Sequence, residues 1–203
     1  MSRSTKLIIV LWAALFSAGG VLLALTLATN RPVEAPASSQ APIGGPFTLV
    51  DTKGETVTDQ TYRGKWLLIY FGYTYCPDAC PTALNNISGA LEKLGSDAGK
   101  LEALFITVDP KRDTPRAMAE YLKSFDPRIV GLTGSQAQTD SAAKAYRVYV
   151  APQKSDGDDY LVDHSSFLYV VNARGEFVNV IGGDLSGGQM ADKLRAMMER
   201  AGT

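Results

Sequence analysis

The stretch that most restricts the fold is residues 65–73, KWLLIYFGY, a nearly continuous run of apolar and aromatic side chains. A strand with one face in water would alternate apolar and polar residues, and this stretch does not. It is therefore expected to be buried on both faces, as in the middle of a sheet that has helices on both sides. Residues 101–108 largely repeat this composition. The sequence thus predicts an α/β domain with buried central strands.

Strand and helix signals alternate along the rest of the chain. Apolar residues at spacings of three and four predict a helix over residues 80–94, which Gly95 would end. Thr114 and Pro115 form a helix start, because threonine can cap a helix and proline needs no N–H in its first turn. The other expected elements are hairpins at 47–58 and 165–181, helices at 115–125, 136–146 and 185–201, and extended segments at 129–132 and 147–151.

This order predicts a thioredoxin-like domain over residues 47–203, with a central mixed sheet flanked by helices and an N-terminal hairpin extension. Strands that alternate with helices imply a parallel centre, and the late hairpin adds antiparallel strands.

An uncharged stretch precedes this domain. Residues 7–29 carry no charge over 23 positions, enough to cross a hydrocarbon core of roughly 30 Å at about 1.5 Å per helical residue. Arg3 and Lys6 come before it, and positive residues favour the cytoplasmic side. We expect a transmembrane helix, with residues 1–6 in the cytoplasm.

A cleaved secretory signal is the alternative for this stretch, with residues 26–28 (TLA) as a cleavage site. Both interpretations export residues 31–203. Residues 30–46 are rich in Pro, Ala, Ser and Gly and are predicted to be a linker. No Arg-rich transit peptide precedes the apolar stretch. The expected location is therefore a bacterial inner membrane, crossed once, with the soluble domain in the periplasm.

Composition limits the chemistry that the chain can perform. The net charge is −1 and no basic stripe is present, so nucleic acid is not an expected partner. The chain has only two cysteines, Cys76 and Cys80, and one histidine, His164. Two cysteines with three residues between them cannot staple a domain of this size, which excludes a disulfide framework. Any chemistry that needs a thiolate or an imidazole must use these three residues.

Cys76 and Cys80 directly follow the predicted strand at 65–73, and ligands in open α/β sheets bind at the carboxyl ends of strands. Because the two thiols are four positions apart, they would lie on one face if both were on a helix, within reach of one metal. Amide groups at a helix start also favour thiolate over thiol. A metal site, a redox dithiol and a structural pair are the three interpretations, and the scarcity of cysteine disfavours the last.

His164 favours the metal site. We expect it to begin a strand, and in a thioredoxin-like sheet the loop before that strand faces the cysteines. Redox enzymes of this fold have a cis-proline there, whereas this chain has an imidazole. Two thiolates and one imidazole form a soft set that suits Cu(I), and also Cu(II) with an added oxygen ligand. A structural zinc usually takes four protein ligands, and the chain has no fourth Cys or His.

Other groups carry weaker signals. Asp163 is either a hydrogen-bond partner that orients the imidazole or a turn residue. Asp109 is expected to serve the chemistry of a turn with Arg112 and Asp113. Residues 155–159, SDGDD, are typical of a solvated acidic loop, with docking of a partner as the alternative. Methionines on predicted helix faces are expected in the core rather than on copper: Met118, Met190, Met197 and Met198.

The segments around these residues resemble the Sco/SenC family of copper proteins over most of residues 43–200. The resemblance is carried by Gly64-Lys65, YFGYTYCPDACPTAL (70–84), TVDPKRDTP (107–115), GLTG (131–134), AYRVY (145–149) and DYLVDHSSFLYVVNARGEF (159–177). It implies a thioredoxin-like fold, an N-terminal membrane anchor and copper binding by Cys76, Cys80 and His164. Members of the family help to assemble the dinuclear copper centre in subunit II of cytochrome c oxidase, so that subunit is the implied partner.

The expected function is that of a copper chaperone, which binds one copper and delivers it to subunit II, with another copper chaperone as a candidate donor. The alternative is a thiol–disulfide reductase that keeps the copper-ligand cysteines of that subunit reduced, with Cys76 and Cys80 as the redox pair. A peroxide or redox sensor is a third hypothesis.

Overall fold

The two predicted buried strands form the middle of a seven-stranded sheet. The computed structural model describes residues 43–153 and 160–201. β3 (Trp66–Gly72) pairs in parallel with β4 (Leu101–Thr107), and every residue of β3 is buried. The order of strands across the sheet is β2-β1-β5-β4-β3-β8-β9. The remaining strands are β1 (Thr48–Asp51), β2 (Thr56–Thr58), β5 (Ile129–Thr133), β8 (Phe167–Val171) and β9 (Phe177–Gly182).

The sheet is mixed, as the element order predicts. β3, β4 and β5 run parallel to one another, whereas β8 pairs antiparallel with β3 and β9 antiparallel with β8. On the other side, β1 pairs antiparallel with both β5 and β2. The N-terminal hairpin is therefore an edge of the main sheet, and the carboxyl ends of β3 and β4 meet at one end of it.

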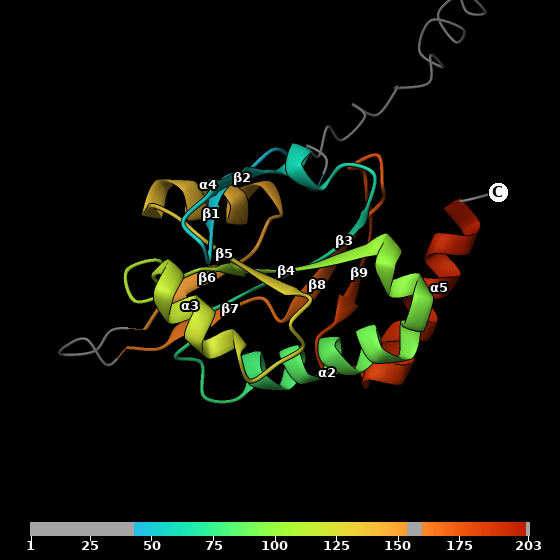
Figure 1. The fold of residues 1–203 in the computed structure, drawn as a ribbon. Helices are drawn as coiled ribbons and strands as arrows, with labels where there is room; N and C mark the ends of the chain where they lie inside the picture. The colour runs from blue at the N-terminus through green and yellow to red at the C-terminus, as the bar shows by residue number, and fades with distance from the viewer. Residues whose placement is uncertain (1–42, 154–159, 202–203) are drawn as a thin grey trace, which may run out of the picture. The chain divides into compact units, whose positions relative to one another are not determined.

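Helices cover both faces of this sheet (Figure 1). α2 (Ala79–Leu94) packs against α5 (Gly187–Ala201) on one side, and α4 (Gln136–Ala145) lies on the other. α3 (Pro115–Leu122) packs on β5. Two 3-10 turns, η1 (Asp59–Tyr62) and η2 (Gly95–Lys100), precede β3 and β4. Met118 and Met190 are buried, and Met197 and Met198 pack against the core, which confirms their expected role.

Local signals explain where these helices begin and end. The Thr114 side chain accepts a hydrogen bond from the backbone N–H of Ala117, as predicted for a cap followed by proline. α2 stops at Gly95, which has a φ of 57°. α3 ends at Leu122 and not near Phe125, because the backbone N–H groups after it bond three residues back in tighter turns.

A separate two-stranded sheet is the main departure from prediction. Among the strands of residues 43–153 and 160–201, β6 (Val150–Pro152) and β7 (Val162–His164) pair only with each other, and we call them the β6–β7 ribbon. The expectation that His164 begins the strand at 165–171 was wrong, since it ends β7. The extended segment also starts later than residue 147, because Arg147 has a φ of 55°. Three-residue strands are too short to give a readable alternation.

Three sequence predictions fall wholly or mainly outside the described residues: the anchor at 7–29, most of the linker at 30–46, and the acidic stretch at 155–159. Within residues 43–153 and 160–201, no helix has the length and apolar character needed to cross a membrane.

The packing of α2 on α5 depends on a close approach of two glycines. A Cβ at Gly187 would lie 2.7 Å from the carbonyl carbon of Gly89 and 2.8 Å from the backbone nitrogen of Ala90. Backbone atoms cannot rotate away as the end of a side chain can, so the helices would have to separate. A Cβ at the neighbouring Gly188 would meet no atom of another described segment within 4 Å.

Gly187→Ala is expected to lower the free energy of unfolding by about 1–3 kcal/mol, the usual cost of overpacking. Gly188→Ala is the matched control in the same helical turn, and it should leave stability unchanged or raise it by up to about 1 kcal/mol. Urea unfolding of residues 43–203 measures both changes. Equal stabilities of the two variants would contradict the close helix contact.

Candidate metal centre

The two cysteines lie in the turn between β3 and α2. α2 begins at Ala79, so Cys80 is in its first turn and Cys76 precedes the helix. Cys76 thus lies before the helix, as the predicted helix at 80–94 implies, and the one-face geometry of residues four apart on a helix does not apply to this pair. They meet because the turn folds back, with the Cys76 N–H donating to the Tyr73 carbonyl and the Cys80 N–H lying 3.4 Å from the Cys76 Sγ. Pro81 is tolerated here because backbone N–H groups in the first turn of a helix have no hydrogen-bond partner within the helix, so the missing N–H of proline costs no bond.

His164 comes to the same point from the end of β7. Its Nε2 lies 3.4 Å from the Cys80 Sγ. Its Nδ1 lies 3.1 Å from the carbonyl oxygen of Ser165, which can only accept a hydrogen bond. Nδ1 therefore carries the proton, and the lone pair of Nε2 faces the thiols. This is the tautomer that a metal ligand needs.

The three ligand atoms, Cys76 Sγ, Cys80 Sγ and one ring nitrogen of His164, all lie within 4.8 Å of one another. Metal–sulfur and metal–nitrogen bonds of about 2.3 Å and 2.0 Å put neighbouring trigonal ligands roughly 4 Å apart. The observed spacing thus admits one ion with small side-chain adjustments. The structure brings together all three residues that the sequence singled out.

The two thiols differ in their electrostatics. A hydrogen bond from Cys80 lowers the pKa of Cys76 to about 3, with further bonds from the backbone N–H groups of Asp78 and Cys80, while burial opposes the shift. The same bond to Cys76, together with burial, raises the pKa of Cys80. The pair therefore holds one thiolate on the half-buried Cys76 and one proton on the buried Cys80. A helix start alone would have predicted two thiolates.

Residues of β3 complete the centre, and sequence analysis did not single them out. The Tyr70 hydroxyl lies 3.8 Å from the Cys80 Sγ. A Cβ at Gly72 would lie 2.7 Å from that sulfur, so only glycine allows the helix start to approach the strand. A glycine inside an otherwise bulky buried strand is the signal that could have revealed this approach.

Two buried aspartates support the surrounding loops. The Asp113 carboxylate accepts hydrogen bonds from the Thr74 N–H at 3.1 Å and from the hydroxyls of Thr74 and Thr107 at 2.6 Å. It thereby fixes the segment that leads into Cys76, and burial raises its pKa. Asp109 bonds Arg112 at 2.5 Å and its backbone carbonyl accepts from the Asp113 N–H, which confirms its expected role in a turn.

Asp163 does not face the centre in the way that an orienting partner of the imidazole would. It is exposed, and its carboxylate accepts a hydrogen bond of 2.8 Å from Gln153. The carbonyl of Ser165 occupies the orienting position at His164 instead. Asp163 and His164 are adjacent in a strand, and adjacent side chains point to opposite faces.

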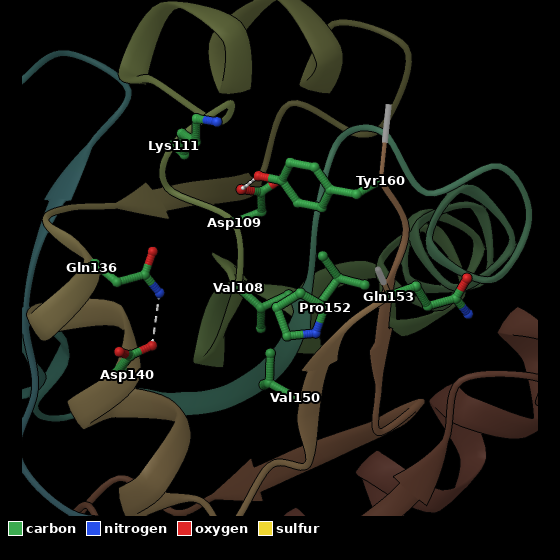
Figure 2. A pocket seen from close by; sticks show the side chains of 10 residues that line it. Val108, Asp109, Lys111, Gln136, Asp140, Val150, Pro152, Gln153 and Tyr160 are labelled. Carbon is green, nitrogen blue, oxygen red and sulfur yellow. Dashed lines mark hydrogen bonds between the residues drawn. The ribbon is translucent and has the colours of Figure 1, made fainter. Parts of the chain in front are cut away.

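A pocket of about 610 Å³ lies beside the β6–β7 ribbon and has neither cysteine in its lining (Figure 2). Four of its polar side chains bond to one another in two pairs. The Asp109 carboxylate accepts from Tyr160 at 2.7 Å, and Asp140 accepts from Gln136 at 2.8 Å. The candidate soft ligands lie at the cysteine turn and do not line this pocket.

The low pKa of Cys76 predicts how fast it reacts with iodoacetamide. Because the thiolate is the reactive form, the alkylation rate of Cys76 in the reduced protein should be nearly constant between about pH 5 and about pH 8. In Cys80→Ala, the largest stabilising hydrogen bond is gone, so the pKa should return toward its ordinary value and the rate should rise with pH. Mass spectrometry of the labelled peptide measures both rates. A parent rate that rises about tenfold per pH unit over this range would contradict the assignment.

Comparison with known proteins agrees with this geometry. The family model described as SCO1/SenC matches residues 35–199. The mitochondrial protein SCO1 homolog of Homo sapiens is 43% identical over 159 residues, which are 77% of this chain and 53% of that protein. The SCO2-like protein RP587 of Rickettsia prowazekii (strain Madrid E) is 38% identical over 200 residues, which are 96% of this chain and 97% of that protein.

A solved structure with the same arrangement of elements is that of Bradyrhizobium japonicum ScoI with copper bound. It is 44% identical, with a TM-score of 0.72, and the match covers 76% of this chain and 99% of that chain. The chain spans about half the length of the human relative and nearly all of the rickettsial one. With a family model matched over most of its length, and with relatives of this similarity, the chain belongs to the SCO1/SenC family.

Proposed function

We propose that the protein is a copper chaperone that binds one copper ion through Cys76, Cys80 and His164. The observation that carries the proposal is the approach of these three ligand atoms to within 4.8 Å of one another. A relative that is 44% identical has been solved with copper bound. The lone pair of the His164 Nε2 already faces the thiols, so binding needs loss of the Cys80 proton and little rearrangement.

The donor set favours copper over zinc. Thiolate and imidazole are soft or intermediate ligands that suit Cu(I), and they also accept Cu(II) when an oxygen ligand is added. Structural zinc usually takes four protein ligands, and the sequence has no further Cys or His.

Transfer of the metal is proposed to proceed by ligand exchange. Cys76 and His164 are partly exposed, whereas Cys80 is buried. A recipient can therefore reach the metal from the side of Cys76 and His164. The family resemblance implies that the recipient is the dinuclear copper centre of cytochrome c oxidase subunit II, and another copper chaperone is the candidate donor.

The proposed location is a bacterial inner membrane, with residues 7–29 as the anchor and the soluble domain in the periplasm. The proposal is supported by the 23 uncharged residues and by Arg3 and Lys6 before them. Confinement of chaperone and recipient to one membrane raises their effective concentration.

An anaerobic copper titration of the reduced protein, with a competing chelator of known affinity, tests the copper site. His164→Ala should weaken Cu(I) binding at least about tenfold, because a ligand is lost. Asp163→Asn is the matched control on the adjacent residue, and it should bind copper as the parent does. An unchanged affinity of His164→Ala would show that the three-ligand site is wrong.

A second function, thiol–disulfide reduction, is favoured by the thiolate on Cys76. Cys76 Sγ would attack a disulfide of the target and form a mixed disulfide, which Cys80 Sγ would then resolve. The target gains two electrons and two protons, and Cys76 and Cys80 become a disulfide. The two functions can coexist in one protein at different times. The reduced pair can bind copper, and its oxidation to a disulfide removes two copper ligands.

Reduction of the oxidised soluble domain of an oxidase subunit II separates the two functions. Cys76→Ser should abolish this reduction because the attacking thiolate is gone, whereas His164→Ala should retain it. Free thiols on the subunit are counted by mass spectrometry after alkylation. If Cys76→Ser reduces the subunit as fast as the parent, the reductase proposal fails.

A further inference from the structure

The β6–β7 ribbon carries His164, and the metal centre requires it to be held in place next to the two cysteines. It holds one of the three ligands, His164, yet it does not pair with the main sheet that positions the two cysteines. Within the described residues, its backbone ladder joins only β6 to β7. After His164 the chain enters β8 of the main sheet at Phe167, which fixes the ligand from one side. On the other side, side chains must hold the segment before His164, so that its Nε2 stays 3.4 Å from the Cys80 Sγ.

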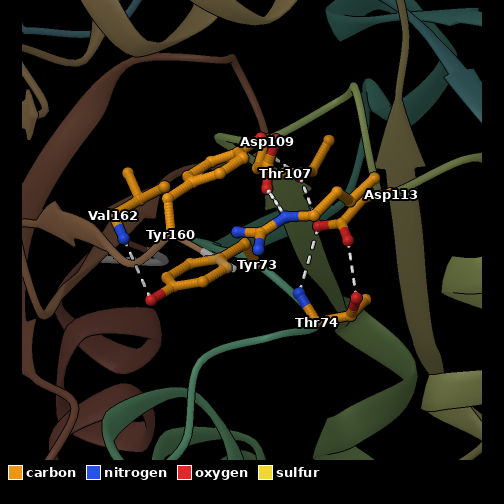
Figure 3. A network of polar contacts seen from close by, with 8 residues as sticks. Tyr73, Thr74, Thr107, Asp109, Asp113, Tyr160 and Val162 are labelled. Carbon is orange, nitrogen blue, oxygen red and sulfur yellow. Dashed lines mark hydrogen bonds and ion pairs between the residues drawn. The ribbon is translucent and has the colours of Figure 1, made fainter. Parts of the chain in front are cut away.

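One such connection comes from the end of β3. The buried Tyr73 hydroxyl accepts a hydrogen bond of 3.1 Å from the backbone N–H of Val162, two residues before the ligand. Its ring also meets the His164 ring edge-on, with 5.8 Å between the ring centroids. Figure 3 shows Tyr73 and Val162 joined in this way, on the side of the network that faces the ribbon.

A second connection comes from the turn after β4. The Tyr160 hydroxyl donates a hydrogen bond of 2.7 Å to Asp109, which is only 4% exposed (Figure 3). Asp109 also receives the Nε–H of Arg112 at 2.5 Å. A bond to a buried carboxylate that is paired with a guanidinium is among the stronger kinds of neutral-to-charged contact.

Arg112 links this second connection to the cysteine turn. Its guanidinium carbon lies 3.8 Å from the centroid of the Tyr160 ring and 4.5 Å from that of Tyr75. Tyr75 immediately precedes Cys76. The segment that leads into β7 and the segment that contains Cys76 are therefore stacked against one cation.

We propose that Tyr160 is a positioning residue for His164, and that it acts by tying the segment just before β7 to Asp109 and Arg112. The proposal rests on the copper site proposed above. Tyr160 lies four residues before His164 and has no place among the three ligands. Its hydroxyl restricts the movement of the His164 imidazole relative to the two cysteines.

Tyr160→Phe removes the hydroxyl and keeps the ring that stacks on Arg112. We expect Cu(I) binding by the reduced protein to weaken about tenfold, as follows from loss of a hydrogen bond to a charged group. The alkylation rate of Cys76 should stay the same, since the cysteine turn keeps its own bonds. The matched control is Tyr62→Phe in η1, which lies before the start of β3, at the other end of that strand, and should bind copper as the parent does.

A double-mutant cycle separates positioning from general stability. In the His164→Ala background, Tyr160→Phe should have no further effect on copper affinity, because there is no imidazole left to position. An equal tenfold loss in that background, or the same loss in Tyr62→Phe, would overturn the proposal. In the Cu(II) form, the EPR coupling to a ligand nitrogen should weaken in Tyr160→Phe and stay unchanged in Tyr62→Phe.

A measurement without metal keeps the proposal distinct from the copper site itself. In the reduced metal-free protein, amide hydrogen exchange at Val162 and His164 should be about tenfold faster in Tyr160→Phe, with unchanged exchange in β3. If the parent binds no copper, the proposed function fails, and faster exchange would still support the role of Tyr160 in holding the ribbon. Unchanged exchange at both residues would overturn that role.

Discussion

Burial of β3 between β4 and β8 is the constraint on which the metal centre depends. All of its residues are buried, and both of its edges are hydrogen-bonded. The strand therefore cannot shift without opening the core. Its last residue, Gly72, lies directly under the Cys80 sulfur, so the start of α2 is placed by contact with the strand. The position of the cysteine turn is therefore fixed by its contact with the buried central strand β3.

The two cysteines have different properties although they share one turn. Cys80 is enclosed by β3 and α2 and keeps its proton, whereas Cys76 is partly exposed and holds a thiolate. An ion bound here would thus have one sulfur on the rigid side and one on the side open to a partner. This asymmetry suits the proposed exchange of ligands, and it equally suits thiolate attack on a disulfide. Both proposals depend on the same feature, a thiolate on the partly exposed Cys76.

The third ligand depends on a different kind of structure. His164 ends a short ribbon that is outside the main ladder, and hydroxyls of Tyr73 and Tyr160 join the segment before it to the domain. Breaking one side-chain hydrogen bond costs less free energy than separating a whole strand from its sheet. The centre therefore combines two candidate ligands on the main sheet and α2 with a third on the smaller ribbon, an arrangement that would suit the release of copper in the proposed function.

Sequence reasoning succeeded where the signal is local. The buried strands, the capped helix at Thr114, the end of α2 at Gly95 and the three ligand residues were all predicted from composition, spacing and scarcity. It failed where the outcome depends on contacts between distant segments. The ribbon was missed because three-residue strands give no periodicity.

The sequence by itself determined the inventory: a fold with a doubly buried strand, and a chain with only two thiols and one imidazole for soft-metal or redox chemistry. Only the tertiary structure decided that the His164 Nε2 meets Cys80 across 84 positions of sequence, and that one thiol is charged and the other is not. The physical reason is that a pKa and a ligand distance are set by neighbours in space. Those neighbours, among them Tyr70, Gly72 and the Ser165 carbonyl, come from strands whose pairing no local pattern records.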